Sequence, residues 1–405
     1  MSVLPKIAWR NLWRSTRRTW LTIASMTLGL ALTVVMRGMQ EGTYAHSTDH
    51  MIHLLSGDLQ IHRNGFTDDK NLRYAFAVDD ALRELLAELP QVAGWAPRVV
   101  ADGLVSTEEA TKGIRLLGID PQKESSVTTL KNRVIEGDWL ETVSEGAVLG
   151  KGLKEALDAR IGDSLVVMVQ GRYGGLTGAL IPVVGILRTG WPEIDRTTLF
   201  VRLEQAQTML NLDDAILEIA LRTTDLRKVP AVVIWLNQNL SSRWETHTWS
   251  ELLPEIEQMI RFDRVGGQIF IAILLLVVLF GALNTVLMSV VERARELRMM
   301  LAVGMTPGSL GRMVAIETGI MLLIGMVLGH IIAAPINLYL AANPIYFTGE
   351  TAAMIEEIGW EPMVTSQYTW LLVGSSTLMM AAIGLVVVLW PLKRIYQIRT
   401  IKERE

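Results

Sequence analysis

Four long apolar segments constrain this chain more than any other feature of its sequence. They cover residues 19–37, 267–291, 313–340 and 369–390. A helix needs about 20 predominantly apolar residues to cross the hydrocarbon core of a bilayer, and each segment is close to or above that length. The sequence therefore predicts a membrane protein with four transmembrane helices.

Lysine and arginine gather at one end of these segments, which predicts how the chain is oriented. Five precede the first segment, four lie in the loop 292–312 and five follow the fourth segment: Lys6, Arg10, Arg14, Arg17, Arg18, Arg293, Arg295, Arg298, Arg312, Lys393, Arg394, Arg399, Lys402 and Arg404. The loop 341–368 has four glutamates and no lysine or arginine. Basic residues stay on the cytoplasmic side, so we expect residues 1–18, 292–312 and 391–405 to face the cytoplasm.

The long segment 38–266 would then be a folded domain on the opposite side. β-like runs separated by turn signals predict strands at 59–63, 114–119, 164–170, 179–187 and 198–203. Other runs read as helices at 81–89, 203–211 and 226–240, the last interrupted or shifted by Pro230. We expect residues 39–56 and 250–267 to prolong the first two spans as a helical stalk. The predicted fold is an α-helical membrane protein with four transmembrane helices and a large α+β domain inserted between the first and second.

Several classes of site are excluded or disfavoured. The chain has no cysteine, which excludes disulfides and thiolate metal sites, and its formal net charge of −4 gives no basis for nucleic-acid binding. His46 and His50 share a helical face, but no HExxH pattern surrounds them, so we expect a solvated helix face and no metal. The run GAVLGKGL (146–153) has one residue too few for a phosphate loop. We expect no catalytic residue.

A glycine-rich run, QGRYGGLTGAL (170–180), separates two predicted strands. It is either an ordinary hairpin turn or an exposed loop that docks a partner. In the second case the contact residues would be Arg172, Tyr173, Gly174, Gly175 and Leu176.

The stretch VERARELRMMLAVGMTPGSL (291–310) places charged residues directly after an apolar span. Residues 292–303 predict a short amphipathic helix with Leu297 on its apolar face. Gly304 is suited to end that helix, and Thr306 with Pro307 to begin the next. The physical chemistry alone leaves two interpretations equally open: a helix lying on anionic lipid headgroups, and a helix that docks a protein.

This stretch, followed by MVAIETGIMLLIGMVLGH (313–330), resembles the signature of the FtsX/MacB/LolC-type ABC transporter permeases. The opening AWRNLWRSTRRTWLTIASMTLGLAL (8–32) is similar to the basic start of that family. Within the family, the runs LLGIDP (116–121), EGDWL (136–140) and IGDSL (161–165) look most like the lipoprotein-releasing LolC/LolE branch. The ending PLKRIYQIRTIKERE (391–405) departs from the family pattern, so the resemblance implies no role for it.

The resemblance implies a bacterial inner-membrane permease with a periplasmic domain. It would work with a second permease chain, identical or related, and with separate cytoplasmic ABC ATPase subunits that bind ATP and Mg; this chain would hold no cofactor. ATP-driven movements would be transmitted to the periplasm, most simply to release lipoproteins to a periplasmic carrier. The alternatives are a MacB-like efflux or export permease and an FtsX-like regulator of a cell-wall hydrolase.

The resemblance also implies site residues. The helix 292–303 would be the coupling helix on the ATPase, with Glu292, Arg293, Glu296 and Leu297 in contact and Ala302 and Gly304 allowing close packing and a sharp turn. A carboxylate one turn into a span is costly, so Glu317 is a second candidate. We expect it to be a structural anchor paired with Arg312 or with the basic N-terminal helix.

Overall fold

The computed structural model describes residues 3–89, 91–357 and 360–400. The chain divides into two compact units. The first, here called the helical unit, comprises residues 1–45, 259–346 and 363–405. The second, the sheet unit, comprises residues 46–258 and 347–362. Residues 1–2 of the predicted N-terminal helix and 401–405 of the predicted tail lie outside the described residues.

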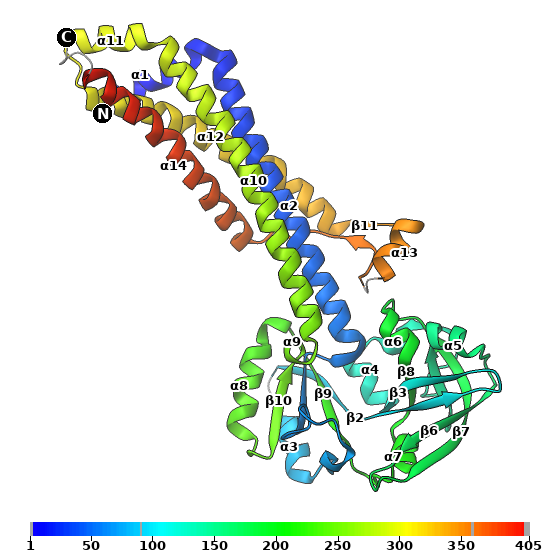
Figure 1. Cartoon of the computed structure of the whole chain (residues 1–405). Helices are drawn as coiled ribbons and strands as arrows, with labels where there is room; N and C mark the ends of the chain where they lie inside the picture. Colours follow the sequence, from blue (N-terminus) through cyan, green and yellow to red (C-terminus); the bar gives the residue numbers. More distant parts are fainter. Residues whose placement is uncertain (1–2, 90, 358–359, 401–405) are drawn as a thin grey trace. The chain divides into compact units, whose positions relative to one another are not determined.

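The helical unit contains the long apolar helices (Figure 1). Its helices are α1 (Val3–Leu12), α2 (Thr16–Met51), α10 (Pro254–Glu292), α11 (Ala294–Ala302), α12 (Pro307–Ala342) and α14 (Trp370–Thr400), with a 3-10 turn at Trp13–Ser15. Four of them, α2, α10, α12 and α14, are long and apolar enough to cross a membrane. The prediction of four membrane helices is therefore confirmed. Both α2 and α10 continue into the sheet unit, so much of the predicted stalk is helical.

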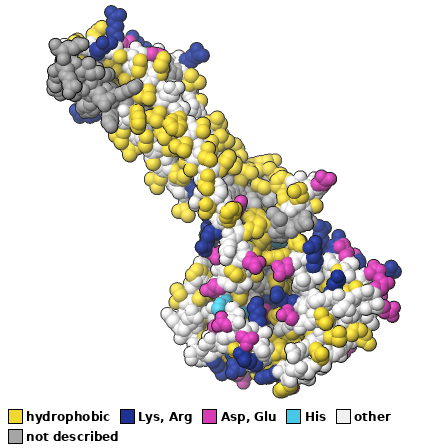
Figure 2. All heavy atoms as spheres, viewed as in Figure 1, with side chains coloured by type: hydrophobic (Ala, Val, Ile, Leu, Met, Phe, Trp, Pro, Cys, Tyr) yellow, Lys and Arg dark blue, Asp and Glu magenta, His cyan; other side chains and the backbone are white. Residues whose placement is uncertain are grey.

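Small residues let the membrane helices approach closely. A Cβ added at Gly29 of α2 would lie 2.4 Å from a methyl carbon of Val278 on α10. A Cβ at Gly325 of α12 would lie 2.8 Å from the Cβ of Met26 on α2. Helices in lipid associate largely through such close packing, since burying apolar surface brings little gain there. Hydrophobic side chains cover much of the visible face of this unit (Figure 2).

The sheet unit is built on a mixed ten-stranded sheet in the order β10-β1-β9-β2-β3-β8-β5-β7-β4, with β6 paired to β2 and β7. The strands are β1 (Leu59–Arg63), β2 (Val92–Ser106), β3 (Thr111–Ile119), β4 (Val134–Gly137), β5 (Ala147–Gly150), β6 (Ser164–Gln170), β7 (Leu176–Leu187), β8 (Thr198–Arg202), β9 (Glu218–Thr223) and β10 (Trp244–Thr248). The β3–β8 and β5–β7 pairs are parallel. All five predicted strands are present, and β2, β4, β5, β9 and β10 were not predicted.

Short helices complete this unit. They are α3 (Asp80–Glu88), α4 (Pro121–Val127), α5 (Lys151–Leu157), α6 (Pro192–Thr197), α7 (Leu203–Leu210), α8 (Val229–Asn239), α9 (Trp249–Leu252) and α13 (Glu350–Glu357). The prediction for 226–240 needs a correction. Residues Leu226–Lys228 form a 3-10 turn and α8 begins at Val229, so Pro230 occupies the first turn of the helix. Proline is tolerated there because its missing N–H has no partner in a first turn.

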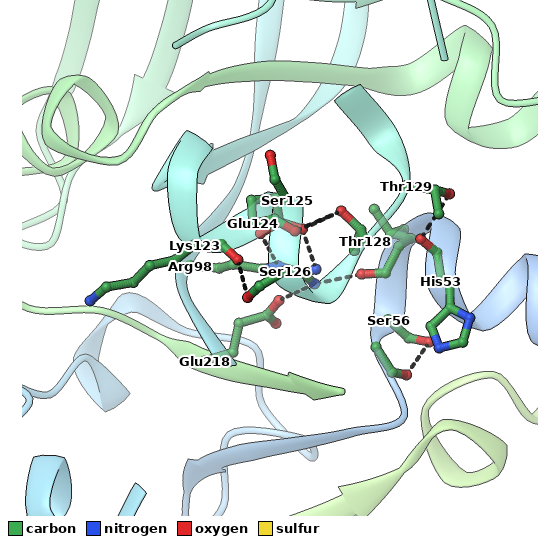
Figure 3. Close-up of polar contacts among 12 residues, drawn as sticks. His53, Ser56, Arg98, Lys123, Glu124, Ser125, Ser126, Thr128, Thr129 and Glu218 are labelled. Carbon is green, nitrogen blue, oxygen red and sulfur yellow. Dashed lines mark hydrogen bonds and ion pairs between the residues drawn. The ribbon is translucent and has the colours of Figure 1, made fainter. Parts of the chain in front are cut away.

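A buried ion pair joins β2, α4 and β9 (Figure 3). The fully buried Arg98 guanidinium donates to both Glu124 oxygens, at 3.0 and 2.6 Å, and to the Leu55 carbonyl at 2.5 Å. Glu218 lies 3.4 Å from the same guanidinium. Burial by itself raises the pKa of Glu218, but His62 and Arg98 outweigh that effect and lower it below its usual value. Buried charges need such partners, so this network fixes α4 on the sheet.

Candidate functional site

The segment 292–310 folds as a helix, a tight turn and a second helix. The long helix α10 ends at Glu292, and α11 begins at Ala294. Gly304 follows α11 with φ of +104°, a backbone conformation that favours glycine. The Thr306 hydroxyl accepts a hydrogen bond from the Ser309 N–H at 3.3 Å, and Pro307 is the first residue of α12. The predicted turn and cap are confirmed, and the short helix starts two residues later than predicted.

The inner face of α11 is packed against the rest of the helical unit. Leu297 is buried in a cluster formed with residues of α1, α10 and α12, namely Ala8, Val290, Leu310, Met313 and Val314. Burying one large apolar side chain contributes about 1.5–3 kcal/mol to stability in water. It holds the short helix against its neighbours and makes α1 part of the same assembly.

Arg293, at the junction of α10 and α11, forms an ion pair with Glu317 on α12. A guanidinium N–H donates to Glu317 Oε1 at 2.8 Å, and the two side chains are 16% and 10% exposed. A small cavity of about 30 Å³ adjoins the pair and is also lined by Thr22, Ser289 and Thr318. The second terminal nitrogen of Arg293 is buried without a hydrogen-bond partner among the described residues. The pair therefore links the end of one membrane helix to the first turns of another.

The expected partner of Glu317 was wrong. Arg312 precedes Glu317 by five positions, which places their side chains about 140° apart around α12. Arg312 is exposed and its Nε donates to the Gly308 carbonyl at 3.4 Å. Arg14 of the basic N-terminal segment pairs with Glu296 at 2.9 Å instead. The anchoring cation is Arg293, which the sequence had suggested as a surface contact.

The outer face of α11 carries a different set of residues. Of the four expected contacts, Glu292 at the end of α10 is exposed, Glu296 is partly exposed and pairs with Arg14, and Arg293 and Leu297 face inward. Ala302, expected to allow close packing, is exposed. The exposed residues near them, which sequence reasoning missed, are Arg295, Arg298, Met299 and Val303, the last 86% exposed. Helical spacing on the side opposite Leu297 was the signal that could have found them. Among the described residues, no atom outside its own neighbourhood in the chain lies within 4 Å of a Cβ added at Gly304.

Three tryptophans flank this site on the N-terminal segment. Trp9, Trp13 and Trp20 are exposed, and consecutive rings meet edge to face at 5.8 and 6.2 Å. Exposed arginines at positions 10 and 14 lie beside them in the sequence. Tryptophan and arginine are the residues that settle at the boundary between lipid and water. This segment therefore has the character of a membrane-surface anchor.

The glycine-rich run 170–180 forms the tip of the β6–β7 hairpin in the sheet unit. The Gly171 N–H donates to the Gly175 carbonyl at 2.8 Å, and Gly174 has φ of +84°. The Arg172 N–H donates to the Leu210 carbonyl at 2.9 Å, which ties the tip to the end of α7. Tyr173 is 82% exposed, and Leu176 is equally open to solvent. The five predicted residues therefore come together as one exposed, partly apolar tip.

The histidines of the first long helix do not converge on one point. His46 Nε2 lies 2.8 Å from Glu361 Oε2, and His50 Nδ1 lies 2.9 Å from a guanidinium nitrogen of Arg133. His53 is buried, with Nε2 3.1 Å from Asp58 Oδ1. His46 and His50 both lie near Glu361 Oε2, the second at 3.9 Å, while His53 has different neighbours, so the predicted solvated face holds only in part.

Comparison with known proteins gives two matches to family profiles. A MacB-like periplasmic core domain matches residues 19–238, which is more than half of the chain. An FtsX-like permease C-terminal domain matches residues 268–399. The first contains the sheet unit up to α8, and the second contains α11, Arg293 and Glu317. The two matches together account for most of both units.

Two relatives cover most of the chain. The lipoprotein-releasing system transmembrane protein LolC of Neisseria meningitidis is 21% identical over 358 residues, covering 81% of this chain and 83% of that protein. The lipoprotein-releasing system transmembrane protein LolE of Haemophilus influenzae is 24% identical over 324 residues, covering 77% of each. The crystal structure of the periplasmic region of MacB from Actinobacillus actinomycetemcomitans overlaps 49% of this chain and 92% of its own, with 13% identity and a TM-score of 0.35.

Proposed function

Because this chain belongs to the family of permeases with a MacB-like periplasmic core domain and an FtsX-like C-terminal domain, we propose that it transmits mechanical work in a lipoprotein-releasing ABC transporter. ATP and Mg are bound by a separate cytoplasmic ATPase subunit. A second permease chain, identical or related, completes the membrane part. The substrate is a lipoprotein of the inner membrane, as the names of the two relatives suggest.

The proposal rests on one observation, the two-sided construction of α11. Its inner face is fixed to α10 and α12 by the Arg293–Glu317 pair and by buried Leu297. Its outer face presents Met299 and Val303 beside two arginines. Because this short helix is fixed to two membrane helices, a force applied to its outer face is transmitted directly to them. Exposed apolar residues with flanking charges suit a protein groove better than anionic lipid alone.

The orientation follows from the charge asymmetry of the loops. Residues 292–312 and both chain ends face the cytoplasm, where the ATPase is, and the sheet unit faces the periplasm. The exposed hairpin tip at Tyr173 and Leu176 is then available to a periplasmic carrier that receives the lipoprotein. Exposed aromatic and aliphatic side chains on a fixed turn are suited to such docking.

Site-specific crosslinking tests this proposal. The chain has no cysteine, so a single introduced cysteine is a unique attachment point. We expect Met299→Cys and Val303→Cys to crosslink in native membranes to a protein that mass spectrometry identifies as an ABC ATPase. Leu297→Cys, on the same helix but buried, is the matched control and should give no such product. Absence of an ATPase adduct from both exposed positions would contradict the proposal.

The same approach separates the alternative functions. A cysteine at Tyr173 should crosslink to a soluble lipoprotein carrier if the function is lipoprotein release. An adduct with a cell-wall hydrolase would favour an FtsX-like regulator, and one with an efflux adaptor would favour a MacB-like exporter. Either result would be consistent with the coupling role of α11 but would change the function assigned to the periplasmic side.

A further inference from the structure

Three side chains that commonly bind metals meet on adjacent strands of the sheet unit. His62 lies on β1 directly opposite Glu245 on β10, and His247 is two residues further along β10. Alternate residues of a strand point to the same side, so all three share one face. One ligand atom from each residue lies within 4.8 Å of the others. This cluster is separate from α11 and from the hairpin tip.

His62 has one buried ring nitrogen without a hydrogen-bond partner among the described residues. Its Nε2 lies 3.1 Å from Gln60 Oε1 and 3.7 Å from Glu218 Oε2, two acceptors that place the ring proton on Nε2. Its Nδ1 is then the unprotonated atom. That atom is buried without a hydrogen-bond partner among the described residues, in a side chain only 2% exposed.

His247 has the same arrangement with the ring nitrogens exchanged. Its Nδ1 lies 3.8 Å from Glu251 Oε2, so a carboxylate faces that side of the ring. Its Nε2 lies 3.4 Å from Glu245 Oε1 and is buried without a hydrogen bond to any described residue. Metal-binding histidines usually donate the N–H that does not face the metal to a carboxylate or carbonyl. His62 meets that condition through Gln60, whereas the Glu251 carboxylate lies near His247 without a hydrogen bond to it.

Glu245 is held in place by the loop that follows β1. Its Oε2 accepts a hydrogen bond from the Gly65 N–H at 2.9 Å. Its Oε1 accepts from the Thr67 N–H at 3.1 Å and from the Thr67 hydroxyl at 2.8 Å. Such outer hydrogen bonds fix the position of a ligating carboxylate before the metal arrives.

We propose that His62, Glu245 and His247 bind a divalent transition-metal ion, with Zn²⁺ the best fit. Two buried ring nitrogens without hydrogen bonds are unfavourable, and a metal ion would satisfy both. Zn²⁺ bonds of about 2.0–2.2 Å to nitrogen and oxygen place tetrahedral ligands roughly 3.3 Å apart. The 3.4 Å between His247 Nε2 and Glu245 Oε1 already matches that spacing. Mg²⁺ and Ca²⁺ prefer oxygen ligands and fit this set poorly.

Three protein ligands leave a fourth position for water or a small ligand. A cavity of about 350 Å³ is lined by His62, Thr67 and Glu251 among others, although Glu245 and His247 do not line it. The ion would also join the edge strand β10 to β1, and β10 is the last strand before α10. The site would therefore stabilise the sheet edge from which the chain returns to the membrane helices.

Zinc titration of the full chain tests this inference. The protein in detergent micelles is stripped with a chelator, and Zn²⁺ alone is added in a calorimeter, with Mg²⁺ as the comparison ion. We expect one tight Zn²⁺ site per chain and a higher melting temperature with zinc. His247→Gln and Glu245→Gln should each weaken binding more than tenfold, and Mg²⁺ should not bind.

His46→Gln is the matched control, because His46 lies in the same unit and pairs with Glu361. It should leave Zn²⁺ affinity unchanged. Metal-free melting temperatures of the Gln variants show whether each still folds. Equal Zn²⁺ uptake by wild type and His247→Gln, or loss of uptake in His46→Gln alone, would overturn the assignment. The result is independent of ATPase crosslinking at α11, so either proposal can fail without the other.

Discussion

At the scale of single residues, two buried ion pairs are expected to be especially important for stability. Arg98–Glu124 lies in the interior of the sheet unit, and Arg293–Glu317 lies among the membrane helices. Removing one partner from such a pair leaves a buried charge without compensation, whereas replacing both can be nearly neutral. Single and double substitutions therefore separate a structural requirement for the charges from a requirement for the pair itself.

The first prediction concerns Glu317. Glu317→Gln leaves the partly buried Arg293 with only Glu296, 3.6 Å away, as a nearby carboxylate among the described residues, and should lower the stability of the helical unit by up to about 3 kcal/mol. Arg293→Gln with Glu317→Gln should be less destabilised than the sum of the two single changes. Thermal unfolding in micelles measures this. We also expect Glu317→Gln to insert in the membrane but to loosen the coupling of ATP hydrolysis. Loss of expression would mean that Glu317 serves folding only.

The second prediction concerns Glu124. Glu124→Ala removes both oxygens that receive Arg98 and should destabilise the sheet unit by about 3–5 kcal/mol. The control is Glu136→Ala, which breaks the exposed Lys154–Glu136 pair of 2.7 Å. Exposed pairs contribute about 0–1 kcal/mol, so this variant should melt close to wild type. Similar melting temperatures for the two variants would show that the Arg98 network is not a major source of stability.

At the scale of elements, α11 shows how one short helix serves two purposes. Its nine residues are bounded by the junction at Arg293 and by Gly304. The inner and outer faces are then assigned by helical periodicity: Leu297 packs inward, while Met299 and Val303 point outward. A helix this short is not stable alone in water, so its shape depends on the packing of the inner face.

The third prediction compares the two faces. Val303→Asp adds a charge to an exposed site and should leave the melting temperature within error of wild type. It should nevertheless reduce permease-dependent stimulation of the ATPase several-fold, because the outer face would carry an unfavourable charge. Leu297→Asp buries a charge and should destabilise the chain by several kcal/mol. If Val303→Asp retains full ATPase stimulation, the outer face of α11 is not the contact.

At the scale of the whole molecule, membrane insertion and domain folding are encoded in different stretches of the chain. The four apolar helices and the basic loops carry the information for insertion. The sheet unit forms its own core from residues between α2 and α10. Helices α2 and α10 contribute to both membrane insertion and domain folding, because each belongs to both units.

The fourth prediction tests orientation with cysteines introduced one at a time. In cells with a permeable outer membrane, Tyr173→Cys should react with a membrane-impermeant maleimide, because the tip is exposed and periplasmic. Val303→Cys should react only after the inner membrane is disrupted. Labelling of Val303→Cys in intact inner membranes, with or without labelling of Tyr173→Cys, would contradict the proposed topology.

Some features of this protein were set by the sequence itself, because they depend on neighbouring residues. Span length, the helix break at Gly304 and the Thr306–Pro307 start are local properties of composition and backbone preference. The strand at 59–63 was predictable from its alternating apolar and polar residues, and that at 164–170 from a short apolar run rich in valine. The long strand β2 was not, because Pro97, Arg98 and Asp102 interrupt any apolar alternation.

Only the tertiary structure decided which distant residues meet. Glu317 has Arg293 and not Arg312 as its partner because the α10–α11 junction brings the arginine to that face of α12. His62 and His247 come together through the pairing of β1 with β10, strands separated by most of the sheet unit in sequence. Periodicity specifies which face of an element is buried, but the partner that covers it depends on chain topology. For that reason the membrane layout followed from the sequence, and the anchoring ion pair and the proposed metal site required the fold.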